Sequence, residues 1–558
     1  MSSPTLTRAR RAYARIEAVD RPEVWIDLRP QAEVEDEARA IDERVTAGER
    51  LPLAGKLFAA KGNIDVRGLP TTAGCPAYAY APEADAPAVA RLRAAGAIVL
   101  GTTNLDQFAT GLVGTRSPHG AVRNALDPAR VSGGSSSGSA VAVALGIVDF
   151  ALGTDTAGSG RVPAAFNGIV GLKPTRGLVP TTGVVPACAS LDCVTVLART
   201  LPEAEQALAY MTSPSGRDLP ALPQRAPGPW RIAVPPTVQL GELDEGWAEA
   251  YEAAVGHLAA AGAEVRTIDL TPFTEAAAML YEGAFVAERY TAVGSFIDKL
   301  IAEGGAGLDP TVAGIITRAR DIPAHQLYAD QDRLADLRAR ALAELGDADA
   351  LLLPTTPGHP TLAEVAADPL GANARLGRFT NSTNLFDLAS VAVPGGTVDG
   401  LPFGVMLLGP AFTDERLAHI ARLLQPRLRI AVVGAHLSGQ PLNPQLLSLG
   451  AEWERTTTTA PAYRLHALST TPPKPGLVHV GAGGRAVEAE VWRLPAEGLG
   501  RLLADLPRPM TLGRVELADG THVPGFLCEP GALEGAEDIT EYGGWRDYLR
   551  ARSTQPTL

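Results

Sequence analysis

Helical patterns and short apolar runs alternate along most of this chain, and the alternation constrains its fold more than any other feature. The helical pattern of residues 85–96 is followed by the strand-like run AIVLG at residues 97–101, and similar short runs occupy residues 263–270 and 350–355. Residues 244–262 and 324–345 carry apolar side chains at spacings of three and four, which is typical of helices that cover a sheet. The alternation predicts an α/β layer structure.

The character of the sequence changes after the helical pattern of residues 414–425. From Arg429 onward, short alternating segments are separated by turn residues, and the pair Asp519–Gly520 between two of them is typical of a β-hairpin. We therefore expect two domains, residues 1–427 and a smaller, strand-rich domain of residues 428–558. The boundary is expected between Pro426 and Arg429.

The composition narrows the classes of partner. A net charge of −13 gives no electrostatic basis for binding nucleic acid or an anionic membrane, so a small-molecule substrate fits better. The four cysteines form no C-x-x-C pair, which indicates neither a disulfide framework nor a zinc site. The N-terminal segment lacks the apolar core of a signal peptide, and no uncharged apolar run is long enough to cross a membrane. We expect a cytoplasmic protein without a membrane span.

Two clusters of glycine and serine, residues 132–139 and 156–160, are the candidate catalytic segments. A flexible linker would not be interrupted by the apolar run of residues 140–153, and a phosphate-binding loop would need a lysine, which residues 131–161 lack. Gly134–Gly138 matches the nucleophile elbow G-x-S-x-G, centred on Ser136, but no buried strand precedes it. We interpret both clusters as parts of one site. Its predicted oxyanion hole consists of Thr156, Ala157, Gly158 and Ser159.

A serine nucleophile needs a base, and Lys61 is the candidate because it interrupts the apolar segment LFAAKGNI. His119 lies in a turn-like sequence, and a triad with a distant histidine stays an alternative. A strand-end lysine that reaches water is the alternative for Lys61. A base must be neutral at pH 7, which costs an ordinary lysine ~4.6 kcal/mol. Burial can supply a shift of that size.

Three segments, AAKGNID (59–65), SGGSSSGSA (132–140) and GTDTAGSGRVPAAFNGIVGLKPT (153–175), together resemble the amidase signature family, which uses a Ser-cisSer-Lys triad. Lys61 precedes Ser159 by 98 positions and Ser135 precedes it by 24, and both spacings agree with the family. The resemblance covers residues 20–425 and implies a central mixed β-sheet covered by helices. It also implies that Lys61 is the base, Ser135 the bridging serine after a cis peptide and Ser159 the nucleophile, with no metal or organic cofactor. Gly62 departs from the family, which often has aspartate there.

The segment LYEGAFVAERY places Tyr281 and Arg289 eight positions apart, so on a continuous helix both side chains could lean toward one pocket. An amphipathic helix with an exposed arginine is the alternative. Together with residues 68–80 and 155–161, this segment resembles the allophanate hydrolase group of the family. The resemblance implies that Tyr281 and Arg289 hold a small carboxylated urea.

The strand-rich C-terminal part of the chain carries a second resemblance. VVGAHLSGQPLN (432–443) and EYGGWRDYLRA (541–551) resemble the second domain of allophanate hydrolases, an α+β domain related in fold to γ-glutamylcyclotransferases. The resemblance makes His436 a candidate for decarboxylating the first product. A buried or turn histidine in an assembly domain is the alternative.

The sequence therefore predicts an amidohydrolase that releases ammonia from allophanate and leaves N-carboxycarbamate, which decarboxylates. The resemblance implies a homodimer with functional coupling to a urea carboxylase. The alternatives are an amidase for malonamate, biuret or aliphatic amides, an amidotransferase subunit, and a non-catalytic scaffold that binds a partner.

Overall fold

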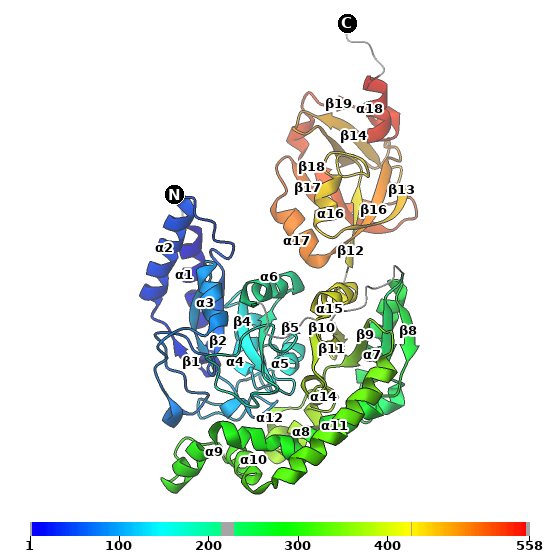
Figure 1. Ribbon diagram of the computed structural model, residues 1–558. Coiled ribbons are helices and arrows are strands. Elements are labelled where there is room, and N and C mark those ends of the chain that lie inside the picture. The colour runs from blue at the N-terminus through cyan, green and yellow to red at the C-terminus, as the bar shows by residue number, and fades with distance from the viewer. Residues whose placement is uncertain (1–2, 214–227, 426, 554–558) are drawn as a thin grey trace. The chain divides into compact units, whose positions relative to one another are not determined.

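The computed structural model describes residues 3–213, 228–425 and 427–553. The chain divides into two compact units, Met1–Leu424 and Gln425–Leu558 (Figure 1). Pro426, where the predicted boundary begins, lies outside the described residues. None of the helices in the described ranges is long and apolar enough to span a membrane.

The first unit is built on one mixed sheet of eleven strands, ordered β1-β3-β2-β4-β6-β5-β10-β11-β9-β7-β8. Strand β2 pairs in parallel with β3 and β4, whereas β4 pairs antiparallel with β6, so the predicted mixed α/β sheet is confirmed. The strands are β1 (Trp25–Leu28), β2 (Leu57–Lys61), β3 (Ile98–Thr103), β4 (Phe150–Asp155), β5 (Val170–Lys173), β6 (Cys193–Ala198), β7 (Arg231–Val234), β8 (Glu264–Thr267), β9 (Ala350–Pro354), β10 (Leu388–Val398) and β11 (Leu401–Pro410).

Helices bury the sheet on both faces. Along β2, Leu57 and Ala59 enter one hydrophobic core, and Phe58 and Ala60 enter another. A strand buried on both faces needs apolar residues at every position, which explains its continuous apolar run. The helices are α1 (Pro4–Val19), α2 (Gln31–Thr46), α3 (Pro87–Ala94), α4 (Ser137–Ala144), α5 (Arg161–Phe166), α6 (Leu201–Met211), α7 (Trp247–Ala260), α8 (Thr271–Glu282), α9 (Ala287–Ala302), α10 (Pro310–Arg318), α11 (Ala324–Leu345), α12 (Leu362–Ala367), α13 (Gly371–Leu376), α14 (Asn381–Leu385) and α15 (Asp414–Ala421).

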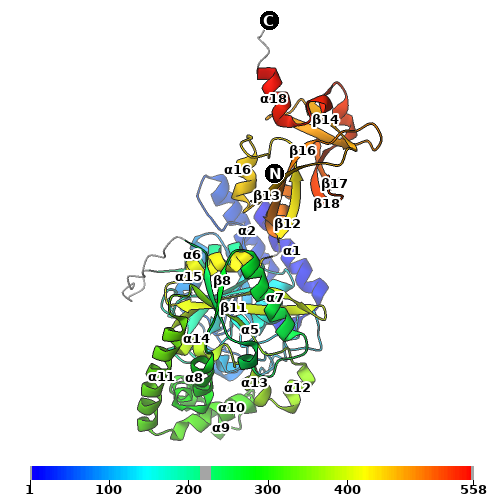
Figure 2. The same ribbon diagram turned by 90° about the vertical axis from the view of Figure 1, so that its right-hand side faces the viewer.

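Helices α8 to α11 group together at one end of the first unit in both ribbon views (Figures 1 and 2). Tyr281 and Arg289 do not lie on one continuous helix, because α8 ends at Glu282 and Gly283 adopts an extended backbone. A Cβ on Gly283 would lie 2.7 Å from the Met279 carbonyl oxygen. Asp330 of α11 also accepts a hydrogen bond from the Ala284 N–H, which fixes the break.

The second unit contains two smaller sheets. One has the order β13-β16-β12-β18-β17, the other β15-β14-β19, and the hairpin predicted at Asp519–Gly520 joins β17 to β18. Its elements are β12 (Arg427–Val432), α16 (Asn443–Ser448), β13 (Glu452–Thr458), β14 (Tyr463–Leu468), β15 (Lys474–His479), β16 (Glu488–Pro495), α17 (Ala496–Ala504), β17 (Met510–Glu516), β18 (His522–Cys528), β19 (Glu537–Asp538) and α18 (Trp545–Ser553).

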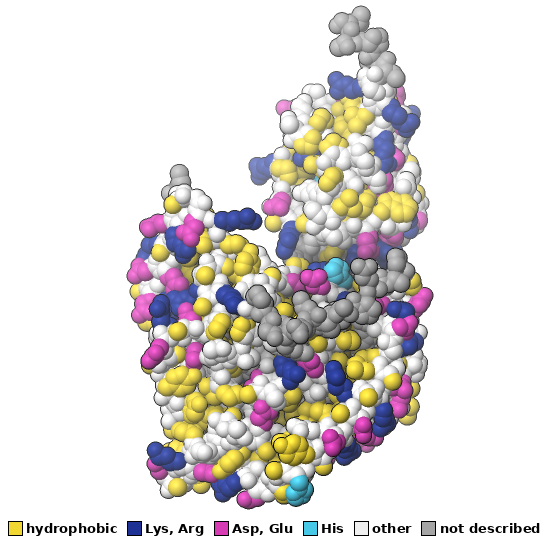
Figure 3. Space-filling view, viewed as in Figure 1, with side chains coloured by type: hydrophobic (Ala, Val, Ile, Leu, Met, Phe, Trp, Pro, Cys, Tyr) yellow, Lys and Arg dark blue, Asp and Glu magenta, His cyan; other side chains and the backbone are white. Residues whose placement is uncertain are grey.

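Acidic and basic side chains are mixed over the face shown in Figure 3. Among the described residues visible there, lysines and arginines gather into no continuous basic region. The four cysteines are free thiols.

Candidate active site

Lys61, the last residue of β2, is completely buried and reaches the serine of the first cluster. Its Nζ donates to Ser135 Oγ at 2.7 Å and to Thr154 Oγ1 at 2.8 Å. The alternative of a lysine that reaches water is therefore wrong. The Gly134–Ser135 peptide is cis, as the resemblance implies.

Burial lowers the pKa of Lys61 to about 7, although the carboxylates of Asp106, Asp192 and Asp155 oppose that shift. A large neutral fraction of the amine therefore exists near pH 7. A Cβ on Gly62 would lie 2.5 Å from Ile26 Cδ1 and 3.1 Å from the Thr103 carbonyl oxygen, so a side chain here would require the end of Ile26 to move. The glycine at this position, where the family often has aspartate, thus goes with the position of the Ile26 side chain.

The two glycine and serine clusters lie side by side. The Ser136 N–H donates to the Ser159 carbonyl oxygen at 3.2 Å, and the Asp106 N–H donates to the Ser135 carbonyl oxygen at the same distance. Ser159 Oγ contacts the Gly111 carbonyl oxygen at 3.5 Å, the outer limit of a hydrogen bond, so this contact holds the hydroxyl only weakly. Ser136 Oγ donates to the Thr154 carbonyl oxygen at 3.1 Å, which ties the serine of the formal elbow match to β4.

A buried ion pair fixes the turn that carries Ser159. Asp155 accepts from Arg161 Nε and Nη2 at 2.9 Å each, and both side chains are fully buried. Burial raises the pKa of Asp155, but Arg161, with help from the charge of Lys173 and the Gly160 N–H, outweighs burial and holds the pKa at about 2. The same carboxylate accepts from the N–H groups of Gly158 at 2.8 Å and Gly160 at 3.0 Å.

This geometry corrects one member of the predicted oxyanion hole. The Gly158 N–H points at Asp155 and is not free for a substrate oxygen, which leaves the N–H groups of Thr156, Ala157 and Ser159 as candidates. Gly158 has a φ of +129°, and a Cβ there would lie 2.4 Å from Thr380 Oγ1. The Thr380 hydroxyl donates to the Ala157 carbonyl oxygen at 2.6 Å, so the residue that precedes helix α14 closes the turn from the far side.

Tyr281 and Arg289 meet despite the break between α8 and α9. Arg289 Nη2 donates to Tyr281 Oη at 3.1 Å, and Nη1 donates to Thr110 Oγ1 at 2.9 Å. Arg289 is 1% exposed, so the alternative of an exposed arginine is wrong. Its Nε is buried without a hydrogen-bond partner, and no ion pair joins it to a carboxylate among the described residues, although the charges of Asp192 and Glu288 act on it. Thr110 neighbours Gly111, the contact of Ser159, so the guanidinium lies close to the nucleophile turn.

Sequence reasoning missed the residues that hold these groups in place. Asp155 and Arg161 were detectable, because they are two opposite charges within an otherwise uncharged segment. Thr380 and Asn384, which donates to the Asp155 carbonyl oxygen at 2.8 Å, left no signal, because the contact spans more than 200 positions. Asp192, whose carboxylate accepts from Thr156 Oγ1, was missed for lack of any periodic pattern around it.

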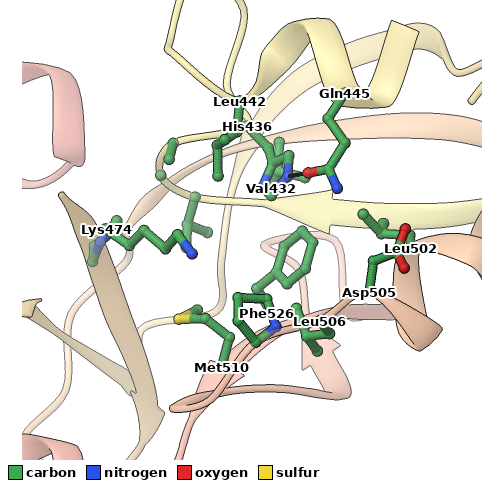
Figure 4. A pocket seen from close by; sticks show the side chains of 15 residues that line it. Val432, His436, Leu442, Gln445, Lys474, Leu502, Asp505, Leu506, Met510 and Phe526 are labelled. Atoms are coloured by element: carbon green, nitrogen blue, oxygen red, sulfur yellow. Dashed lines mark hydrogen bonds between the residues drawn. The ribbon is translucent and has the colours of Figure 1, made fainter. Parts of the chain in front are cut away.

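His436 lines a cavity of about 190 Å³ in the second unit (Figure 4). Its Nε2 lies 2.9 Å from Gln445 Oε1, and its ring stacks on Phe526 with centroids 4.7 Å apart. Burial lowers the pKa of His436, and Lys474 lines the same cavity. The histidine is thus half-buried and held in one orientation at a pocket wall.

Comparison with known proteins gives the class. The model of the Amidase family matches residues 9–418, and the model described as Allophanate hydrolase C-terminal domain matches residues 428–550. The chain belongs to the amidase family. It is 39% identical to the solved Kluyveromyces lactis allophanate hydrolase, with a TM-score of 0.70 over 99% of this chain and 97% of that one.

Two urea amidolyases are also similar to nearly the whole chain. The proteins from Lachancea kluyveri and Saccharomyces cerevisiae are each 42% identical, over 94% and 90% of this chain respectively. The chain spans only 31% and 30% of their lengths. The solved allophanate hydrolase is thus matched over nearly its full length, whereas the urea amidolyases contain much additional sequence.

Proposed function

We propose that this protein hydrolyses allophanate to ammonia and N-carboxycarbamate. One observation carries the proposal: buried Lys61, hydrogen-bonded to Ser135, and the turn of Ser159 lie near Arg289, a buried arginine whose Nε has no hydrogen-bond partner among the described residues. Allophanate has a carboxylate one atom away from a reactive amide, so a single molecule can use both parts of the site. The similarity to the Kluyveromyces lactis allophanate hydrolase supports the same substrate.

In the acylation step, neutral Lys61 accepts a proton from Ser135 as Ser135 accepts one from Ser159. Ser159 Oγ then forms a bond to the terminal amide carbon, and the carbonyl oxygen becomes an oxyanion. The N–H groups of Thr156, Ala157 and Ser159 stabilise that charge. The C–N bond breaks as the relay returns a proton to the nitrogen, and ammonia leaves an acyl-enzyme on Ser159.

Water completes the reaction by the same relay. Lys61 and Ser135 take a proton from the water as its oxygen adds to the acyl carbon. The tetrahedral intermediate then collapses, Ser159 leaves with the proton, and N-carboxycarbamate is released. The chain and water supply every group that these steps use.

Arg289 gives the site its preference for an anion. A guanidinium presents two parallel N–H donors to a carboxylate, and charge-assisted hydrogen bonds of this kind are stronger than neutral ones. Tyr281 donates its hydroxyl hydrogen to the same carboxylate while its oxygen accepts from Arg289. We propose that this pair holds the carboxylate of allophanate.

In the second unit, we propose that His436 acts on the released product. N-carboxycarbamate is a dianion at neutral pH, and Lys474 supplies a positive charge in the cavity that His436 lines. As the bond to the departing carbon dioxide breaks, the nitrogen would take a proton that neutral His436 relays from water. Carbamate then decomposes to further ammonia and carbon dioxide.

The substrate also suggests the setting in which the protein acts. We infer a cytoplasmic homodimer that receives allophanate from a urea carboxylase, an activity that makes the carboxylated urea this site would consume. Light scattering coupled to size-exclusion chromatography tests the dimer.

Ammonia release from allophanate, malonamate, biuret and acetamide tests the function. We expect allophanate and malonamate to react far faster than acetamide, which has no carboxylate, and Ser159→Ala to abolish release from all of them. Ser136→Ala is the matched control and should keep most activity, because its hydroxyl is tied to β4. Ammonia release by Ser159→Ala at the wild-type rate would refute the proposal, and a preference for acetamide would indicate an aliphatic amidase instead.

A further inference from the structure

One short loop, residues 187–192, joins the two halves of the candidate active site. Asp192 ends the loop and is 4% exposed. Its carboxylate accepts from the Ala187 N–H at 2.9 Å and from the Cys188 N–H at 3.3 Å, which closes the loop on itself. The same carboxylate accepts from Thr156 Oγ1, so the loop is tied to the first residue of the oxyanion turn.

The outer part of the loop holds the helix that carries Arg289. The Ser190 N–H donates to one carboxylate oxygen of Glu288 at 2.7 Å, and Ser190 Oγ donates to the other at 2.6 Å. Glu288 lies in the first turn of α9, directly before Arg289. Arg176 Nη1 donates to the Ser190 carbonyl oxygen, which fixes this end of the loop to the body of the unit.

We propose that the 187–192 loop sets the distance between the oxyanion turn and Arg289, and thereby the length of the carboxylated amide that reacts. This inference rests on the proposed function, because it needs the substrate carboxylate on Arg289. In it Asp192 and Thr156 are positioning residues at one end, and Ser190 and Glu288 are positioning residues at the other. None of the four side chains touches the reacting atoms.

A fixed distance selects for length because an acyl transfer tolerates little displacement. Allophanate and malonamate have one atom between the amide carbon and the carboxylate carbon, whereas succinamate has two. The additional methylene moves the carboxylate by roughly 1 Å or more, and a misplacement of ~1 Å costs about 100-fold in rate. If the loop holds the distance, loosening either end lowers the discrimination between malonamate and succinamate.

The two ends predict different kinetic effects. The double variant Ser190→Ala, Glu288→Gln should raise KM for malonamate and reduce the malonamate-to-succinamate ratio of kcat/KM at least fivefold, with kcat for acetamide unchanged. Thr156→Val keeps the shape but removes the hydroxyl, so it should lower kcat about tenfold for every substrate, acetamide included. Thr156→Ser restores the hydroxyl and should recover wild-type kcat.

The control variant is Glu303→Gln, which removes the same charge at the other end of α9 and should leave the ratio unchanged. Wild-type enzyme is assayed first with allophanate, and failure there overturns the proposed function and this inference together. If wild type hydrolyses allophanate and the Ser190/Glu288 variant keeps the wild-type ratio, the loop proposal alone is overturned. Rescue by Thr156→Ser separates a positioning role from misfolding.

Discussion

Replacing Arg289 by glutamine tests the proposed substrate recognition most directly. The guanidinium is 1% exposed, donates to Thr110, Ala109 and Tyr281, and leaves Nε without a partner. Asp192 and Glu288 act on this guanidinium through their charge but form no ion pair with it among the described residues, so its donors can serve the substrate carboxylate that we propose. Glutamine keeps a similar length and one N–H donor group but removes the positive charge and the two parallel N–H donors of the guanidinium.

The magnitude follows from the hydrogen bonds lost. Two charge-assisted bonds contribute roughly 1.5–3 kcal/mol each, and glutamine recovers one neutral bond of about 1 kcal/mol. The net loss of about 2–5 kcal/mol corresponds to a fall of roughly 30- to 5,000-fold in kcat/KM. Arg289→Lys keeps the positive charge but not the two parallel N–H donors, so its kcat/KM for allophanate should lie between the values of wild type and of Arg289→Gln.

The assay is continuous ammonia release over a range of allophanate concentrations, with acetamide as the neutral substrate. Because acetamide has no carboxylate, its kcat/KM should change less than threefold in Arg289→Gln. Retained activity on acetamide also shows that the variant is folded. A kcat/KM for allophanate within threefold of wild type would refute the role of Arg289. An equal loss for both substrates would instead indicate general damage to the site.

Three further predictions concern the base, the nucleophile turn and the second unit. Because burial lowers the pKa of Lys61 to about 7 and the base must be neutral, kcat/KM should rise with pH through about 7 and level off above it; a flat profile from pH 5.5 to 8.5 contradicts this role. Gly158→Ala places a Cβ 2.4 Å from Thr380 Oγ1 at a φ of +129° and should reduce kcat more than 100-fold, whereas Gly314→Ala, which meets nothing within 4 Å on α10, should leave kcat unchanged. His436→Ala should release the first ammonia at the wild-type rate and accumulate N-carboxycarbamate, visible by ¹³C NMR of labelled substrate; carbon dioxide release at the wild-type rate would exclude the histidine.

Local patterns allowed much of the fold to be predicted. The run at residues 97–101 forms most of β3, the pattern of residues 324–345 is α11, and Asp519–Gly520 closes a hairpin, because each depends on neighbours within a few positions. The break at Gly283 escaped prediction, since it depends on Asp330 of a different helix.

In the candidate active site, too, the features that depend on neighbouring residues were predictable and those that depend on distant residues were not. Lys61 stood out because a single charge in an apolar strand is visible in the sequence, and the glycine and serine clusters stood out by composition. The engaged N–H of Gly158 was not predictable, because it depends on how the Asp155 side chain is turned. The ties from Thr156 to Asp192 and from Ala157 to Thr380 join polar residues in irregular segments, which carry no periodic signal.

The hydrogen bonds from Thr380 and Asn384 to the nucleophile turn join parts of the chain that are synthesised at different times. Lys61, Ser135 and Ser159 leave the ribosome early in translation, but Thr380 and Asn384, which close the nucleophile turn, follow much later. Strand β10, the neighbour of β5 in the sheet, also comes late. A nascent chain that ends before Thr380 thus holds all three residues of the proposed relay without the segment that shapes the turn. A chain released before Thr380 would therefore lack the hydrogen bonds from Thr380 and Asn384 to this turn.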